Sequence, residues 1–182
     1  MPVSTATYEQ VALEDPTGGW ELVCGNLRSK PAMTTEHSDV IEALDRQLLR
    51  QLDEHDYKVS SNLSRLRIST GSFYVPDLCI IPRALVRRLR ERPGTFEVYE
   101  EPMPLVVEVW SPSTGGYDVE KKLLEYQWRG DLEIWRIHPY ERTLIAWRRR
   151  PDGSYVESLI QTETVQPVAL PGVTIQLASL FE

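Results

Sequence analysis

Two acidic residues lie in apolar stretches, where a carboxylate is costly to bury. Glu108 lies inside the apolar run of residues 105–109, and Asp77 opens a second apolar run that ends at residue 81. An unpaired buried carboxylate costs on the order of several kcal/mol, so each acid needs a cation, a hydrogen-bonding partner or a proton. If the two strands are neighbours, the carboxylates can converge and offer hard oxygen ligands to Mg²⁺ or Mn²⁺. The sequence therefore predicts a divalent-metal site at Asp77 and Glu108.

A cation follows on the next element. Residues 117–126 have the pattern of a helix, and Asp118, Lys122 and Tyr126 recur every fourth residue on one face. Lys122 could orient a water molecule or stabilise the charge that develops on a phosphodiester under attack. A metal at the two acids could polarise the same phosphate and lower the pKa of the attacking water. The two acids and Lys122 thus form a candidate catalytic set for phosphodiester hydrolysis, although Lys122 or an arginine could also form a purely structural ion pair with Glu108.

Further residues could support this site, and each also has a structural interpretation. Asp118 suits the helix dipole at a helix start, and Tyr126 could either pack in the core or hydrogen-bond at the edge of the site. His37 could be a surface or capping residue of the first long helix, or lie near the cleft. Glu42, or Glu36 before it, could add an acid from that helix.

The elements that would position these residues follow from periodicity and turn residues. A long helix, capped by Thr34 or Thr35, has apolar residues at helical spacing, and a hairpin at residues 20–30 turns at Gly25-Asn26. The other expected helices cover residues 5–13, 82–92 and 117–126, and the expected strands cover residues 57–60, 63–68, 73–75, 77–81, 104–110, 131–138, 144–148, 155–160 and 173–177. Buried strands mixed with helices predict an α/β or α+β fold around a mixed sheet.

The composition indicates one globular domain over residues 1–182, with 41% apolar and 26% charged residues. No apolar run reaches the ~20 residues of a membrane span, and no signal peptide is visible, so a cytoplasmic location is expected. Cys24 and Cys79 lack metal-ligand spacing and are expected to be buried free thiols. The net charge of −7 argues against a general nucleic-acid coat protein, but not against a nuclease whose acidic centre binds metal ions.

The motifs around the candidate residues resemble those of a known family. Pro76-Asp77, followed by Glu108-Val109 in a strand, resembles the PD-(D/E)XK nuclease core, which presents Asp, Glu and Lys to magnesium. The usual lysine position, two residues after the glutamate, holds Trp110. The wider pattern is similar to one branch, the Uma-two family, a large bacterial group abundant in cyanobacteria and classed as restriction endonucleases. In that branch the lysine has moved to the following helix, where this chain has Lys122, with Lys121 as the adjacent alternative.

The resemblance covers nearly the whole chain. The other matching segments are Trp20-Glu-Leu-Val-Cys-Gly25, Thr35-Glu-His37, Glu133-Ile-Trp135, Pro171-Gly-Val173 and Leu180-Phe181. One departure is His138-Pro139, where the family usually has Asp-Pro.

The resemblance also implies a structure and an activity. The structure is a restriction-endonuclease-like core, with a central mixed sheet flanked by helices and with extra β-hairpins. The activity is that of a metal-dependent endonuclease on DNA, with Asp77 and Glu108 binding Mg²⁺ (or Mn²⁺) and Lys122 positioning the water. A homodimer is expected on the same ground. The alternative is a non-catalytic module that binds nucleic acid or protein and retains the nuclease scaffold.

Overall fold

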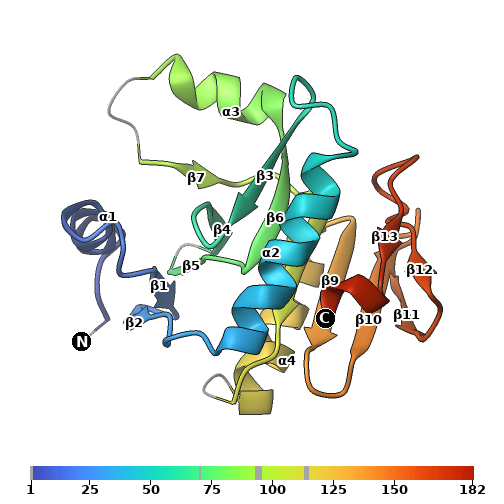
Figure 1. Ribbon diagram of the computed structural model, residues 1–182. Helices are drawn as coiled ribbons and strands as arrows, with labels where there is room; N and C mark the ends of the chain where they lie inside the picture. Colours follow the sequence, from blue (N-terminus) through green and yellow to red (C-terminus); the bar gives the residue numbers. More distant parts are fainter. Residues whose placement is uncertain (1, 70, 93–95, 113–114) are drawn as a thin grey trace.

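A six-stranded mixed sheet forms the centre of the molecule (Figure 1). The structure is a computed structural model that describes residues 2–69, 71–92, 96–112 and 115–182, with the backbone alone for residues 115–119. The strand order is β11-β10-β9-β8-β6-β3, and all neighbours are antiparallel except β8 and β9. The strands are β3 (Tyr57–Ser61), β6 (Leu78–Pro82), β8 (Leu105–Val109), β9 (Glu133–His138), β10 (Thr143–Arg149) and β11 (Tyr155–Ile160).

Helix α4 (Gly115–Arg129) connects the only parallel pair in this described sheet, β8 and β9. Parallel neighbours need a crossover connection, because a tight turn can join only antiparallel strands. The crossover brings α4 back across the strands that carry the acids. The expected mixed sheet with flanking helices is confirmed.

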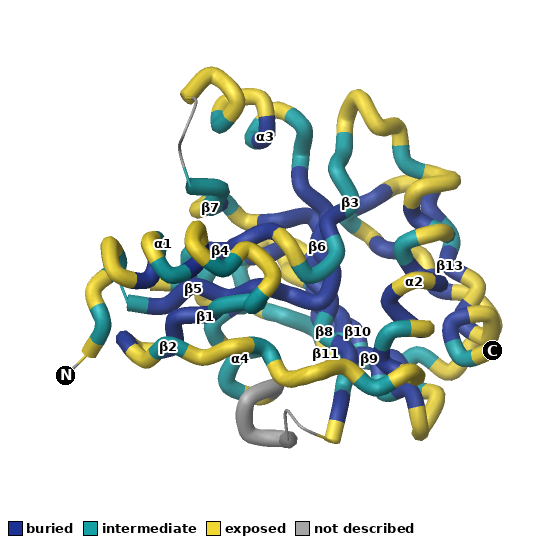
Figure 2. The backbone as a smooth tube through the Cα atoms, turned by 60° about the vertical axis from the view of Figure 1, so that its left-hand side comes forward, coloured by how far each residue is buried: buried dark blue, intermediate teal, exposed yellow. Residues whose placement is uncertain are grey.

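Alternating apolar side chains give the central sheet two buried faces. On one face, Leu78 and Val107 pack with helix α2 (Thr35–Leu49). On the other face, Cys79 and Val106 pack with residues of α4 and of the second sheet. Strands β6 and β8 therefore run through the buried interior of the molecule, as the dark blue of the tube shows (Figure 2).

Helix α2 begins at the cap that the sequence predicts. The hydroxyl oxygen of Thr34 accepts a hydrogen bond from the backbone N–H of His37 at 3.3 Å. An apolar stripe at helical spacing faces the sheet, made of Val40, Ile41, Leu44 and Leu48. Leu49 points away from the sheet and is 59% exposed. This stripe packs α2 against the central sheet, and the first turn of α2 lies toward the ends of β6 and β8.

A second sheet of five strands lies beside the N-terminal helix, in the order β2-β1-β5-β4-β7 (Figure 1). Its strands are β1 (Trp20–Val23), β2 (Asn26–Ser29), β4 (Arg65–Ser69), β5 (Ser72–Tyr74) and β7 (Val98–Tyr99). Helix α1 (Thr5–Glu14) is capped by Ser4, whose hydroxyl accepts from the N–H of Thr7. Strands β3 and β4 are consecutive along the chain but lie in different sheets.

The remaining elements cover the edges. Helix α3 (Arg83–Arg90) follows β6 directly, and β12 (Thr164–Val165) pairs with β13 (Ile175–Gln176) next to a 3-10 turn at Ala178–Leu180. Apolar side chains of this C-terminal segment join the cluster beneath α2. None of the described helices is both long and apolar enough to cross a membrane.

Two expectations about the first hairpin are wrong. Val23 pairs with Asn26, so the turn residues are Cys24 and Gly25 rather than Gly25 and Asn26. Both have positive φ, 49° and 78°, as the favoured two-residue hairpin turn requires. The turn also places Cys24 on the surface, whereas Cys79 is buried as predicted; both cysteines are free.

The packing of α2 generates a stability prediction with an internal control. Leu44→Ala opens a cavity beneath the helix, because Leu44 is fully buried. We expect the free energy of unfolding to fall by about 2–5 kcal/mol, measured by urea denaturation. Leu49→Ala makes the same truncation on the exposed side and should change it by less than about 0.5 kcal/mol. Equal losses in the two variants would contradict this packing.

Candidate active site

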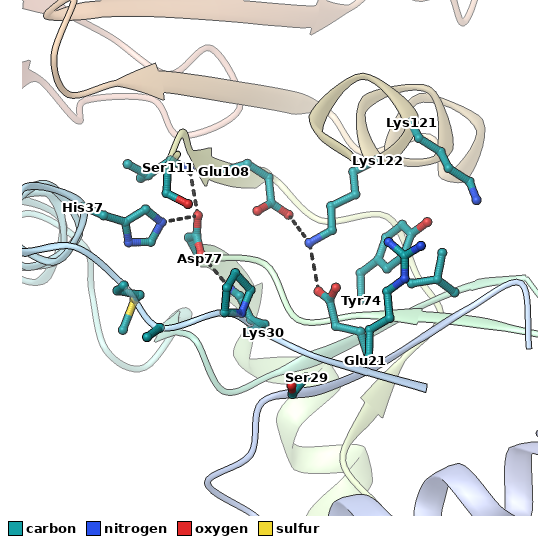
Figure 3. Close-up of a pocket in the computed structure, with 16 residues that line it drawn as sticks. Glu21, Ser29, Lys30, His37, Tyr74, Asp77, Glu108, Ser111, Lys121 and Lys122 are labelled. Carbon is teal, nitrogen blue, oxygen red and sulfur yellow. Dashed lines mark hydrogen bonds and ion pairs between the residues drawn. The ribbon is translucent and has the colours of Figure 1, made fainter. Parts of the chain in front are cut away.

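The register of the central sheet brings the two predicted acids together. Strands β6 and β8 are antiparallel neighbours with Leu78 opposite Val107. Asp77 precedes Leu78 and Glu108 follows Val107, so the acids lie side by side at one end of the pair. Both line the same pocket, at the junction of the two sheets (Figure 3). The condition for the two carboxylates to converge, that their strands are neighbours, is therefore met.

Asp77 is nearly inaccessible to solvent, and protein groups contact both of its oxygens. Its Oδ1 accepts from Lys30 Nζ at 2.6 Å. Its Oδ2 accepts from the backbone N–H of Val109 at 2.7 Å and lies 3.1 Å from Nε2 of His37. Burial alone would raise the pKa of Asp77, but the charge of Lys30 and the contact with His37 outweigh it and hold the pKa well below its usual range. Asp77 is therefore a carboxylate at neutral pH.

Lys30 is a member of the site that the sequence analysis missed. It directly follows β2, and its Nζ donates to three acceptors: Asp77 Oδ1, the side-chain oxygen of Asn62 at 2.7 Å and the backbone carbonyl of Val75 at 2.9 Å. An ammonium group has three N–H bonds, so all of them are used. Its only signal in the sequence is a lysine at the end of a hairpin, which is usually a solvated residue.

Glu108 is held from the side of α4. Its Oε1 accepts from the hydroxyl of Tyr126 at 2.6 Å and lies 3.5 Å from Lys122 Nζ. Among the described residues, its Oε2 has no hydrogen-bonding partner. Burial raises the pKa of Glu108; Lys122 opposes this shift, and the negative charge of Asp77 adds to it. This carboxylate is therefore stabilised less by the protein than Asp77 is.

Lys122 reaches the site from the helix, as the spacing predicts. Its Nζ lies between two acids, donating to Glu21 Oε1 at 2.9 Å and reaching Glu108 at 3.5 Å. Burial opposes its charge, but Glu108 and Glu21 outweigh it and raise the pKa of Lys122 above its ordinary value. The group is therefore a fixed cation. Glu21, a second residue that the analysis missed, also accepts from the backbone N–H of Val75 at 2.8 Å.

Tyr126 is fully buried and contacts Glu108 directly. Burial and the charge of Glu108 raise its pKa well above the usual value, so its hydroxyl stays protonated and donates. Its ring packs edge-on against Tyr74, with the ring centroids 5.9 Å apart. Tyr126 thus fills both of its alternative roles, because it packs in the core and orients a carboxylate.

The other candidates are placed differently. His37 is buried against Asp77, not on the surface, and its Nδ1 has no hydrogen-bonding partner in the described structure. Glu42 is exposed and does not line the pocket; Glu36 contacts Tyr140 instead. The side chain of Asp118 lies outside the described residues. The helix therefore brings His37 to the site and leaves Glu42 away from it.

Comparisons with known proteins identify the family of this chain and a solved structure with the same fold. Residues 5–178 match the family Uma2 (Uma-two), described as “Putative restriction endonuclease”. The chain belongs to the Uma2 family. A solved structure titled as a “putative nuclease belonging to DUF820”, from Anabaena variabilis ATCC 29413, has a TM-score of 0.74 over 89% of each chain at 18% identity. That likeness shows a shared fold. No curated protein matches the chain.

The donor set of this Uma2 protein fits a divalent cation bound partly by groups from outside the protein. In the described part of the chain, no three His, Cys, Asp or Glu side chains are arranged to hold a metal by themselves. Three carboxylates line the pocket, those of Glu21, Asp77 and Glu108. Oε1 of Glu21 is used by Lys122 and Val75, whereas Oε2 of Glu108 and one lone pair on Oδ1 of Asp77 are not used by the contacts above. Magnesium is commonly bound by one or two carboxylates with water and substrate phosphate. The pocket therefore suits a cation that arrives with water and a phosphate.

The environment of Asp77 predicts a pH-dependent contribution to stability. A carboxyl whose pKa is lowered by folding stabilises the fold above its unfolded pKa of about 3.9, and this contribution is lost as the pH falls through the folded value. We expect Asp77→Asn to lower the free energy of unfolding by about 3–5 kcal/mol at pH 7, because it leaves Lys30 without its counter-charge. The difference from wild type should begin to shrink near pH 4 and continue to shrink as the pH falls toward the folded pKa, as denaturant titrations can show. The control is Asp39→Asn, the same change at an exposed acid of α2. An equal loss in Asp39→Asn, or a loss in Asp77→Asn that does not change with pH, would contradict the assignment.

Proposed function

We propose that this protein is a metal-dependent endonuclease that hydrolyses DNA phosphodiester bonds. Asp77 and Glu108 hold Mg²⁺ or Mn²⁺, and Lys122 positions the attacking water. The observation that carries the proposal is the meeting of two carboxylates from adjacent strands with a fixed ammonium group 3.5 Å from one of them. Membership of a family described as restriction endonucleases supports the same chemistry.

Each residue has a separate task in this proposal. A divalent cation, when bound, supplies Lewis acidity and lowers the pKa of water. Lys122 is kept protonated by its two acidic neighbours, so it can donate to a water or to a phosphate oxygen on which negative charge develops. Tyr126 holds Oε1 of Glu108 and leaves Oε2 for the pocket. Val109 and His37 fix Asp77 in the matching orientation.

The rim of the pocket suits a phosphate backbone although the whole chain carries a net charge of −7. Arg28 on β2 and Lys121 on α4 both line it. Cations beside an acidic centre attract phosphates locally, whatever the sign of the total charge. DNA is therefore the proposed substrate. The expected homodimer and cytoplasmic location stay predictions.

One observation favours a second candidate, a module that binds nucleic acid or protein without cleaving it. Asp77 is already paired with Lys30, and Lys122 already bridges Glu21 and Glu108. Each acid thus has a cation from the chain itself. Such a module would bind its partner in EDTA as well as in magnesium, and Glu108→Gln would not change the affinity.

Cleavage assays separate the two functions. We expect supercoiled plasmid or single-stranded DNA to be cut in the presence of Mg²⁺ or Mn²⁺. Cutting should stop in EDTA, because the proposed hydrolysis requires the cation that the two carboxylates hold. Asp77→Asn and Glu108→Gln should abolish cutting, while Asp39→Asn should leave it intact. Far-ultraviolet circular dichroism confirms that each variant is folded. Absence of metal-dependent cutting by wild type, or full activity in Glu108→Gln, would reject the nuclease proposal.

Two adjacent lysines provide a matched test of the catalytic cation. Lys122 contacts Glu108 and Glu21, whereas Lys121 Nζ reaches Cys24 Sγ at 3.3 Å. We expect Lys122→Met to reduce the single-turnover cleavage rate by about 10²–10³-fold, the loss typical of one group that stabilises developing charge. Lys121→Met removes the same charge one residue away and should cost less than about tenfold, since its contribution is rim electrostatics. Similar losses in both variants would show that Lys122 acts through bulk charge alone.

A further inference from the structure

The ammonium group of Lys30 is fixed by three hydrogen bonds, although the residue lies at the end of a hairpin. Its side chain is 15% exposed and donates to Asp77, Asn62 and Val75 at 2.6–2.9 Å. These acceptors come from two segments of the chain, the end of β3 and the crossing between β5 and β6. A surface lysine would instead keep its ammonium in water. The structure therefore places an ammonium group in direct contact with the Asp77 carboxylate.

This charge lies where a divalent cation would have to approach. Oδ2 of Asp77 is used by Val109 and His37, which leaves Oδ1 as the oxygen with remaining capacity. Oδ1 is also the atom that Lys30 contacts. A cation at Asp77 must therefore share one oxygen with an ammonium group, and like charges repel strongly in a partly buried site.

The charges joined by these contacts come close to balance without a metal. Glu21, Asp77 and Glu108 contribute three negative charges, and Lys30 and Lys122 contribute two positive charges. A divalent cation alone would leave this group with an excess of one positive charge. A cation together with one phosphodiester, which carries a single negative charge, would bring it to zero.

We propose that Lys30 is a positioning residue that acts as the resident counter-ion of Asp77 and keeps divalent-cation binding weak until a phosphodiester enters with the cation. Cation and nucleic acid then bind cooperatively, and linkage requires each to raise the affinity for the other by the same factor. The inference rests on the proposed nuclease site. It goes beyond it by giving Lys30 a role and by predicting how the site is filled.

The test measures Mn²⁺ binding by titration calorimetry, first without nucleic acid. Lys30→Gln keeps a hydrogen-bond donor beside Asp77 but removes the charge, so Mn²⁺ should bind at least about tenfold more tightly than to wild type. The titration is then repeated with a phosphorothioate oligonucleotide, which resists hydrolysis. The oligonucleotide should tighten Mn²⁺ binding to wild type by at least about tenfold, and by clearly less in Lys30→Gln.

Controls separate this effect from a general change of charge or fold. Lys58 also pairs with a carboxylate, that of Glu97 at 2.7 Å, but this pair lies outside the pocket. Lys58→Gln therefore removes a paired lysine charge away from the site and should leave Mn²⁺ affinity unchanged. If thermal melting shows that Lys30→Gln does not fold, Asn62→Asp takes its place. It keeps the acceptor at Lys30, offsets the ammonium charge and should shift Mn²⁺ affinity in the same direction by a smaller factor.

The outcomes distinguish this inference from the nuclease proposal. Equal Mn²⁺ affinity in wild type and the Lys30 or Asn62 variant overturns the role of Lys30, even if DNA is cut. Failure of every variant to bind Mn²⁺ overturns it as well. Tighter binding by the variant supports it, even if the plasmid assay finds no cleavage. Oligonucleotide-independent binding of Mn²⁺ to wild type would contradict the cooperative filling of the site.

Discussion

The negative charge of Asp77 must be compensated inside the protein, and the groups that compensate it come from different parts of the fold. Lys30 comes from the end of the first hairpin, His37 from the first turn of α2, and the N–H of Val109 from the end of β8. A buried ion pair adds little net stability but is costly to break. These contacts therefore fix where the parts meet, while the apolar faces of the central sheet supply most of the stability.

The chain itself explains why the site lies between the two sheets. Strand β5 ends at Tyr74 in one sheet, and β6 begins at Leu78 in the other. At this crossing, the N–H of Val75 donates to Glu21 and its carbonyl accepts from Lys30. The same short crossing supplies a partner to both ionic groups, one around Asp77 and one around Lys122. The two groups consequently face each other across one pocket.

The position two residues after Glu108, where related nucleases usually have the lysine, is occupied by an aromatic residue. Trp110, two residues after Glu108, stacks on His138 with the ring centroids 4.4 Å apart and 19° between the planes. His138 is also the residue that departs from the family's usual Asp-Pro, so the departure contributes to this aromatic contact. Trp110 is packed in this way, and the ammonium beside Glu108 comes from Lys122 of α4 instead. The long crossover between the parallel strands thus brings Lys122 to Glu108 as well as connecting the sheet.

The sequence by itself determined the two acids, the lysine and most of the elements that carry them. An acid in an apolar strand stands out against its neighbours, and the four-residue spacing that puts Lys122 and Tyr126 on one face is a local property of a helix. Only the tertiary structure decided which groups compensate those charges. Lys30 is 47 positions from Asp77, and Glu21 is 101 positions from Lys122. Their pairing depends on how the two sheets meet, which no local pattern encodes. The burial of His37 and the exposure of Glu42 were decided in the same way, because a capping pattern gives the start of a helix but not the face that it turns to a site.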